Sequence, residues 1–220
     1  MSKNDIQAFE RTAPTHVNAL SIIADFLISK PEFARKPVNG TIFNTEEYWE
    51  KIATKFANGR IPRPPSKPKT ISDSLIPIIL EEYFGLPKVR TVEIGHEHGL
   101  SMAAENIVGN LLERYIASQM EPAGWVWCSG EIVNKVDFLF PLGSSQGDEP
   151  KWVPLQVKNR DNSENSSSSS VRDGTDIIKW FRSFAKTGAT NWHAFPKSQE
   201  SREITEAAFE AFARNYLRQF

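Results

Sequence analysis

Apolar residues recur every three or four positions along much of the chain, which is the spacing of one face of an α-helix. The first such stretch covers residues 6–33, where Thr15 is the predicted N-cap. The second begins after Thr45, carries two acidic residues in its first turn and ends near Asn58-Gly59. We expect the apolar faces of both helices to pack into a core or against a partner.

The chain between Arg60 and Thr70 is predicted to be extended, because prolines at 62, 64, 65 and 68 are incompatible with a helix interior. Residues 51–70 hold six lysines and arginines and no acid. This composition favours a solvated linker, and the alternative is an arm that lies along a phosphate backbone. A short apolar helix is expected over residues 74–84.

A longer helix is predicted over residues 101–120, with Ser101 as its cap and Glu105 and Glu113 on its flanks. Gly109 lies inside this helix at a cost of about 1 kcal/mol relative to alanine, which predicts close packing against another element. The preceding residues 95–99 read Gly-His-Glu-His-Gly and are expected to form a loop. The two histidines lack a third ligand at useful spacing, so we predict no metal site there.

Short runs rich in β-branched and aromatic residues follow and predict strands. These strands cover residues 124–130, 131–140 and 152–158. Turn-forming residues between the last two predict a hairpin with a long connection. Residues 159–172 are polar and serine-rich, which is typical of a linker or of a DNA-contacting loop. The remaining predicted elements are a helix over 177–184, a strand over 191–195 and an amphipathic helix over 203–217.

The 220 residues are 40 % hydrophobic and 24 % charged, an ordinary balance for a globular protein. A net charge of −1 argues against a protein that binds nucleic acid non-specifically over its whole surface. It is compatible with a local basic groove. No stretch is apolar enough to span a membrane, and the first five residues do not begin a signal peptide. Cys128 is the single cysteine, so we expect no intrachain disulfide and a reducing, cytoplasmic location.

Three polar residues lie within the predicted hairpin and suggest chemistry. Gln156 and Lys158 are two positions apart on one strand and therefore share a face, while Asp137 lies on the neighbouring strand. An acid and a lysine among hydrophobic neighbours cost desolvation unless a metal or substrate compensates them. A carboxylate that holds Mg²⁺ and a lysine that orients water suit phosphodiester hydrolysis. The alternative is a simple salt bridge at the sheet margin.

The order of helix, three strands carrying Asp…Gln-x-Lys, helix and strand resembles the PD-(D/E)xK nuclease core. More specifically, the run from Gln156 to Ser169, with Val171-Arg172, Gly174-Thr175 and Lys179-Trp180-Phe181, resembles the SinI-like group of type II restriction endonucleases. The resemblance implies an α/β restriction-endonuclease-like core over residues 91–220, with a mixed β-sheet flanked by helices. Residues 1–90 would be an N-terminal helical region that includes the basic, proline-rich segment.

The resemblance also implies the roles of individual residues in a Mg²⁺-dependent site. Asp137 corresponds to the metal-binding aspartate and Lys158 to the catalytic lysine, while Gln156 stands where the family motif usually has Asp or Glu. A glutamine supplies a neutral oxygen and no charge, so Glu113 or Glu105 is expected to assist in binding the metal. The implied metal ligands are Asp137, Val157 and Glu113.

The implied substrate is double-stranded DNA with a short, pseudo-palindromic, GC-rich target of the GGWCC kind. A two-fold symmetric target implies a homodimer, and no membrane is involved. The candidate DNA-binding residues are Asn159, Arg160, Asn162, Ser163, Asn165, Arg172, Lys179 and Arg182.

Two other functions remain open from the sequence. A repair or junction-resolving nuclease of the same fold would read DNA structure and cut branched or damaged DNA. A non-catalytic DNA-binding module would carry Gln156 as the mark of a decayed site, although the presence of both Asp137 and Lys158 argues against it.

Overall fold

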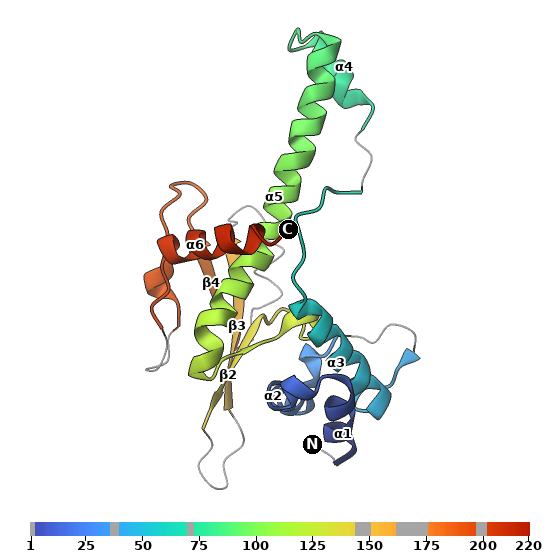
Figure 1. Cartoon of the computed structure of the whole chain (residues 1–220), viewed down its shortest axis with the longest axis vertical. Coiled ribbons are helices and arrows are strands. Elements are labelled where there is room, and N and C mark those ends of the chain that lie inside the picture. The colour runs from blue at the N-terminus through green and yellow to red at the C-terminus, as the bar shows by residue number, and fades with distance from the viewer. Residues whose placement is uncertain (1–2, 36–39, 70–72, 144–150, 162–175, 197–201) are drawn as a thin grey trace.

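The computed structural model describes residues 3–35, 40–69, 73–143, 151–161, 176–196 and 202–220 (Figure 1). The helices are α1 Lys3–Thr12, α2 Val17–Ser29, α3 Glu46–Arg60, α4 Leu75–Glu82, α5 Lys88–Met120 and α6 Glu206–Leu217. The strands are β1 Val126–Trp127, β2 Phe138–Leu142, β3 Lys151–Arg160 and β4 Ile178–Ser183. One sheet with helices on both sides confirms the predicted α/β class.

The four strands form a mixed sheet in the order β1-β2-β3-β4. The pairs β1/β2 and β2/β3 are antiparallel, whereas β3 and β4 run parallel. Phe138 pairs with Leu155, and Leu142 pairs with Lys151, so the predicted hairpin between β2 and β3 is confirmed. This register places Asp137 one position before β2, beside the part of β3 that carries Gln156 and Lys158.

The first predicted helix is wrong as a single element, because α1 and α2 are separated by a short 3₁₀ turn at Pro14–His16. Pro14 has no N–H to donate and favours the first position of a new turn. Thr15 lies inside that turn and caps nothing. The second helix is confirmed, since the Thr45 hydroxyl accepts a hydrogen bond from the backbone N–H of Tyr48.

The predicted loop at residues 95–99 is also wrong, because α5 is a continuous helix of 33 residues and Ser101 lies inside it. Arg90 pairs with Glu93 and Glu97 along one side of this helix, which offsets part of the glycine cost. Gly109 has no atom within 4 Å of the position of an added Cβ, so the predicted close packing there is wrong as well.

The helix predicted over residues 177–184 is wrong, because Ile178–Ser183 form the strand β4. The periodicity of such a short apolar run does not separate a helix from a strand, and here the open edge of β3 offers backbone partners along its length. Residues 191–195 hold a 3₁₀ turn, Trp192–Ala194, in place of the predicted strand. The strand predicted over 131–140 starts later, at Phe138, whereas the C-terminal helix is confirmed as α6.

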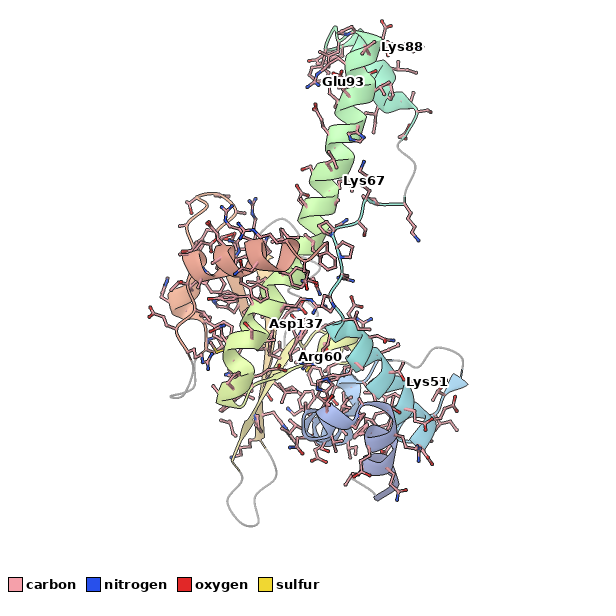
Figure 2. The ribbon with its side chains drawn as sticks, viewed as in Figure 1. Lys51, Arg60, Lys67, Lys88, Glu93 and Asp137 are labelled. Carbon is pink, nitrogen blue, oxygen red and sulfur yellow. The ribbon has the colours of Figure 1, made fainter. Side chains whose placement is uncertain are left out.

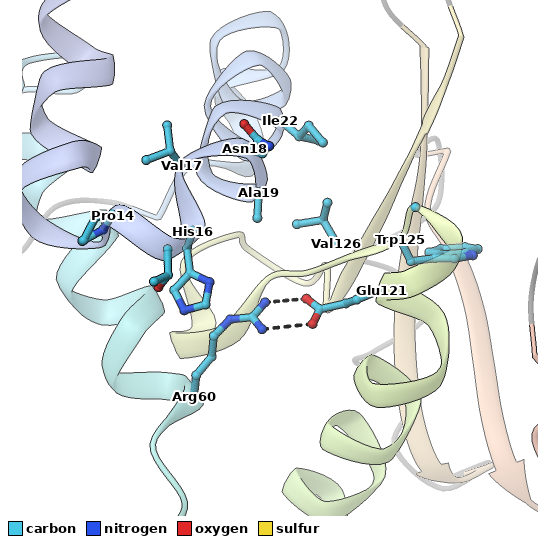
Figure 3. Close-up of a pocket in the computed structure, with 12 residues that line it drawn as sticks. Pro14, His16, Val17, Asn18, Ala19, Ile22, Arg60, Glu121, Trp125 and Val126 are labelled. Carbon is cyan, nitrogen blue, oxygen red and sulfur yellow. Dashed lines mark hydrogen bonds and ion pairs between the residues drawn. The ribbon is translucent and has the colours of Figure 1, made fainter.

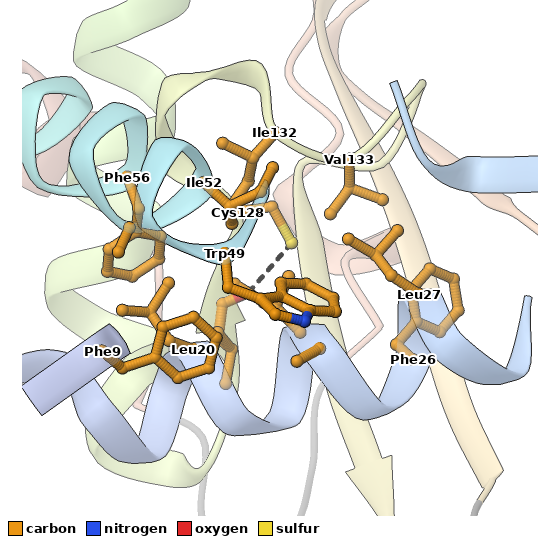
Figure 4. Close-up of a cluster of buried hydrophobic side chains, with 14 of the residues drawn as sticks. Phe9, Leu20, Phe26, Leu27, Trp49, Ile52, Phe56, Cys128, Ile132 and Val133 are labelled. Atoms are coloured by element: carbon orange, nitrogen blue, oxygen red, sulfur yellow. Dashed lines mark hydrogen bonds between the residues drawn. The ribbon is translucent and has the colours of Figure 1, made fainter. Parts of the chain in front are cut away.

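Each face of the sheet carries a hydrophobic core. Phe9, Leu27, Trp49 and other side chains of α1–α3 pack on the face that includes Leu139 (Figure 4). Side chains of α5 and α6 pack on the opposite face, which includes Leu155. The N-terminal helices therefore share a core with the sheet, and α5 runs through the predicted boundary at residue 90. The division into two regions stays a prediction.

Two glycines allow α3 to approach the turn between β1 and β2. A Cβ on Gly59 would lie 2.3 Å from the backbone nitrogen of Gly130, and a Cβ on Gly130 would lie 2.1 Å from the carbonyl oxygen of Lys55. Gly130 also has a φ of +78°, which favours glycine. Ser129 completes the contact by donating from its hydroxyl to the carbonyl of Phe56 at 2.8 Å.

The end of α3 is held by a buried arginine of α5. Arg114 donates from Nη1 and Nη2 to the carbonyls of Gly59, Arg60 and Ile61 at 2.9, 2.8 and 2.6 Å. Its Nε donates to Asn110 Oδ1 at 2.8 Å. One side chain therefore satisfies carbonyls that the helix itself leaves unpaired at its C-terminus.

Replacing Arg114 with methionine should destabilise the protein by at least about 2 kcal/mol, because a buried acceptor that loses its donor costs about 1–3 kcal/mol. Urea unfolding followed by circular dichroism measures the change. Arg11→Met is the matched control, since Arg11 pairs with Glu46 and Glu50 on the surface and its loss should move the midpoint little. Equal midpoints for the two variants would contradict this role of Arg114.

Candidate active site

The four predicted catalytic residues line one cleft of about 590 Å³. Its walls come from the end of α3, the middle of α5, the turn between β1 and β2, and β3. Asp137 enters from the start of β2, Glu113 from α5, and Gln156 and Lys158 from β3. Figure 2 places Asp137 within the body of the molecule, close to where α3 ends at Arg60.

Asp137 is fixed at the point where β2 begins. Its backbone N–H donates to the carbonyl of Leu155, and its own carbonyl accepts from the N–H of Cys128, both at 2.8 Å. The side-chain Oδ2 accepts from the backbone N–H of Val157 at 2.7 Å. The carboxylate is thereby held against the strand that carries Gln156 and Lys158.

Glu113 is oriented by the indole of Trp127, whose Nε1 donates to Oε2 at 3.0 Å. Burial, and then the negative charge of Asp137, raise the pKa of Glu113 to about 7, while the hydrogen bond from Trp127 and the charge of Lys158 act in the opposite direction. The pKa of Asp137 is also raised, mainly by burial, although the Val157 N–H and Lys158 oppose the shift. Two carboxyls that resist ionisation in one cleft are typical of a site that receives a cation.

The predicted alternation along β3 is confirmed. Leu155 and Val157 pack into the core beneath α5 and α6. Gln156 is buried at the floor of the cleft, whereas the Lys158 side chain is exposed at its mouth. Val157 contributes its backbone N–H to Asp137, and its side chain belongs to the core.

The donor set of the cleft suits a hard divalent cation. Asp137 and Glu113 offer carboxylate oxygens and Gln156 offers an amide, which are the ligand types that Mg²⁺ accepts. Within the described part of the chain, no group of three or more His, Cys, Asp or Glu side chains is close enough to hold a metal. A cation held by Asp137 and Glu113 would therefore take its remaining ligands from neutral oxygens and water, since the third acid of the cleft, Glu131, is exposed and paired with Arg35.

Glu113 and Glu105 were both candidates for the assisting acid, and the geometry separates them. Glu105 lines a neighbouring hollow of about 460 Å³ with Lys158, Asn159, Arg160 and Arg182, away from Asp137. Of these two, Glu113 is the acid that shares the larger cleft with Asp137, and the exposed Glu131, which pairs with Arg35, also lines it.

The candidate DNA-binding residues fall into four groups. Arg160 is exposed at the end of β3. Arg182 is engaged within the protein, since its Nε donates to Asn159 Oδ1 at 2.9 Å and its guanidinium pairs with Glu206. Lys179 lies on β4 in register with Gln156. The remaining candidates lie outside the described residues: Asn162, Ser163, Asn165 and Arg172.

Basic residues at the cleft were not anticipated from the sequence. Arg35, Arg63 and Lys135 all line it. Arg63 is held by the hydroxyl of Tyr216 in α6, which accepts from the Arg63 N–H at 2.7 Å and donates to its carbonyl at 3.1 Å. The basic composition of residues 51–70 was the available signal for Arg63, but nothing in the sequence placed its backbone against α6.

A second hollow, of about 440 Å³, lies between α2 and the end of α5 (Figure 3). Its main charges neutralise each other, because Arg60 forms a two-point ion pair with Glu121 at 2.5 and 3.1 Å. The rest of its lining is largely apolar and includes Val17, Ile22 and Val126. This hollow lies where the N-terminal helices meet the end of α5, and we assign it no catalytic or binding role.

Comparison with known proteins extends over nearly the whole chain. Residues 5–219 match the SinI restriction endonuclease family. The type II restriction enzyme SinI of Salmonella infantis is 42 % identical over 215 residues, which cover 96 % of this chain and 92 % of that protein. The type II restriction enzyme Eco47I of Escherichia coli is 44 % identical over 214 residues, which cover 96 % and 91 %. Among the described residues, no helix has the length and apolar character needed to cross a membrane.

The raised pKa of Glu113 predicts a pH-dependent penalty on the metal-free protein. A carboxyl whose pKa rises on folding destabilises the folded protein as the pH increases. The loss begins near the ordinary pKa of 4.5 and continues until the pH reaches the folded-state pKa of about 7. Glu113→Gln keeps the acceptor for Trp127 and removes the charge, so it should raise Tm by several degrees at pH 8. At pH 5, close to the ordinary pKa of the carboxyl, the difference in Tm should be much smaller.

Thermal unfolding in EDTA at both pH values makes this comparison. Glu210→Gln is the control, because Glu210 is exposed on α6 and its replacement should have the same small effect at each pH. A Glu113→Gln variant that is less stable than the wild type at pH 8 would show that the buried carboxylate does not destabilise the folded protein.

Proposed function

The chain belongs to the SinI restriction endonuclease family, and we propose that Asp137, Glu113 and Lys158 form the centre at which it hydrolyses DNA. It is a type II restriction endonuclease, an enzyme that cuts double-stranded DNA at specific sites. The single observation that supports this centre is the cleft in which two carboxyls with raised pKa values lie beside a lysine.

The proposed cofactor is Mg²⁺, which Asp137, Glu113 and Val157 would hold, with Gln156 as a further neutral oxygen donor. When bound, it would stabilise negative charge on the phosphate and acidify a bound water, neither of which the negatively charged Asp137 can do by itself. Gln156 carries no charge, so we expect weaker metal binding than an acid at the same position would give. Val157 contributes through its backbone, whose N–H holds Asp137 in place.

The protein residues have separate tasks in the proposed reaction. Lys158 Nζ, exposed at the cleft mouth, orients the attacking water and offsets the charge that builds up on the phosphate. Trp127 fixes the rotation of the Glu113 carboxylate through its hydrogen bond. Arg63, whose backbone is held by Tyr216, contacts a phosphate of the bound strand.

We further propose a short, pseudo-palindromic, GC-rich target of the GGWCC kind, read by a homodimer. A two-fold symmetric sequence is matched by a two-fold symmetric protein, which brings one centre to each strand. Arg160 and Arg172 are the proposed guanine readers, because arginine pairs with both O6 and N7 of guanine. Asn159, Asn162, Ser163 and Asn165 would contact DNA beside them, with Lys179 and Arg182 on the adjoining strand.

Asp137→Asn and Lys158→Ala should each lower the cleavage rate by about 10²–10⁴ or more while the protein stays folded, since both groups act at the reacting phosphate. The measurement is cleavage of a mixed-sequence plasmid in Mg²⁺, with EDTA as the blank. Discrete fragments that disappear in EDTA are expected for the wild type. Lys158→Ala cleaving at the wild-type rate would remove Lys158 from the centre.

Gln156→Glu restores the acid that the family motif usually carries and should therefore lower the Mg²⁺ concentration needed for half-maximal cleavage. Gln156→Ala is the matched control and should raise it, because the amide oxygen is lost. If the glutamate variant required more Mg²⁺ than the wild type, Gln156 would not face the metal.

Arg160→Ala should weaken binding to the cognate duplex by about 1–3 kcal/mol and binding to a scrambled duplex far less, as expected of a base-reading arginine. Lys67→Ala in the proline-rich arm is the control, and should weaken both duplexes alike and reduce the salt dependence. Titrations at two salt concentrations in Ca²⁺ separate the two effects. Equal losses on both duplexes for Arg160→Ala would mean that it contacts only the backbone.

A further inference from the structure

A helical hairpin projects from the body of the molecule. It consists of α4, a turn through Gly85, and α5 as far as Leu100 (Figure 1). Gly85 has a φ of +65°, and the N–H of Leu86 donates back to the carbonyl of Leu80, which closes the end of α4. Figure 2 places Lys88 and Glu93 at the far end, well away from Asp137.

The hairpin exposes an apolar surface that its own two helices cannot bury. None of the eight residues of α4 is buried, although six of them are leucine, isoleucine or proline. A helix that is apolar on all sides is ordinarily covered, and eight residues alone form a marginal helix in water. Nine large apolar side chains of the hairpin are between 48 % and 81 % exposed: Leu75, Ile76, Ile78, Ile79, Tyr83, Phe84, Val89, Val92 and Leu100.

The charge of the hairpin argues against DNA as the group that covers this surface. Residues 75–100 hold four acids against Lys88 and Arg90, which gives a net charge of −2 with histidine neutral. Arg90 is already paired with Glu93 and Glu97 on its own helix. A hairpin of net negative charge repels a phosphate backbone, whereas its exposed apolar side chains fit another protein surface.

We propose that two copies of the chain associate through this hairpin, with α4 and the start of α5 of each copy packed against those of the other as a four-helix bundle. The inference rests on the proposed function, because cutting both strands of a two-fold symmetric site requires a second Asp137–Glu113 centre. The exposed large apolar side chains of each copy would form the apolar centre of this contact, and a standard interface covers about 800 Å² on each partner.

The continuity of α5 gives this contact a consequence for cleavage. From Val92 to Glu113 the helix rises about 30 Å without a break, at 1.5 Å per residue. Pairing of the two hairpins therefore fixes, through two rigid helices, the separation of the two Glu113 carboxylates. The hairpin sets the spacing of the two cuts without touching either phosphate.

The test uses Ile79→Glu and, separately, Val92→Glu, because both side chains are exposed within one chain and their replacement leaves the fold of that chain intact. Sedimentation velocity at micromolar protein concentration should give a dimer for the wild type and a monomer for each variant, with unchanged circular dichroism. Ile42→Glu, at an exposed isoleucine outside the hairpin, is the matched control and should stay dimeric.

Cleavage of the same proteins separates this proposal from the proposed catalytic centre. Asp137→Asn should remain a dimer and fail to cut, whereas the hairpin variants should lose concerted double-strand cleavage because they are monomeric. A monomeric wild type, or hairpin variants that remain dimeric, would overturn the proposal and leave the catalytic assignment untouched.

Discussion

Burying two carboxyls beside each other costs free energy. Asp137 and Glu113 are buried together in this way in the cleft between α3, α5 and β3. The cost appears as a raised pKa on both groups, because each loses water and Glu113 also meets the charge of its neighbour. The Val157 N–H, the Trp127 indole and Lys158 offset only part of it. A fold keeps such an arrangement when activity depends on it, which is the usual conflict between stability and catalysis.

The surrounding structure holds the two carboxyls in place from both ends of the chain. The backbone contact between Gly59 and Gly130 sets α3 against the turn that leads into β2. Arg114, next to Glu113 on α5, binds the last carbonyls of α3, and Tyr216 of α6 fixes Arg63 at the cleft. Residues on both sides of the predicted boundary at 90 therefore build the cleft, so the N-terminal helices form part of its wall.

The central hairpin was predictable because its signals are local. Alternation along β3, a turn-rich connection and the pair Asp137 and Lys158 were sufficient to place β2, β3 and the polar side chains that these strands bring to the cleft. The identity of β4 was not predictable, because its strand character comes from pairing with β3 and not from its own periodicity. Long-range contacts such as Arg114 with Gly59, or Tyr216 with Arg63, left no pattern in the sequence. Glycines at 95 and 99 suggested a loop, yet the neighbouring ion pairs and α4 keep α5 helical there.

The most direct test of the account is whether Mg²⁺ binding displaces a proton from Glu113. Calorimetric titration of the DNA-free protein with Mg²⁺ at pH 7, in two buffers of different ionisation enthalpy, counts the protons released. A pKa of about 7 predicts the release of at least about half a proton per chain. The release should be smaller in Glu113→Gln. Binding of Mg²⁺ with no proton release, or with the same release in that variant, would contradict the assignment of Glu113 and Asp137 as the metal-binding centre.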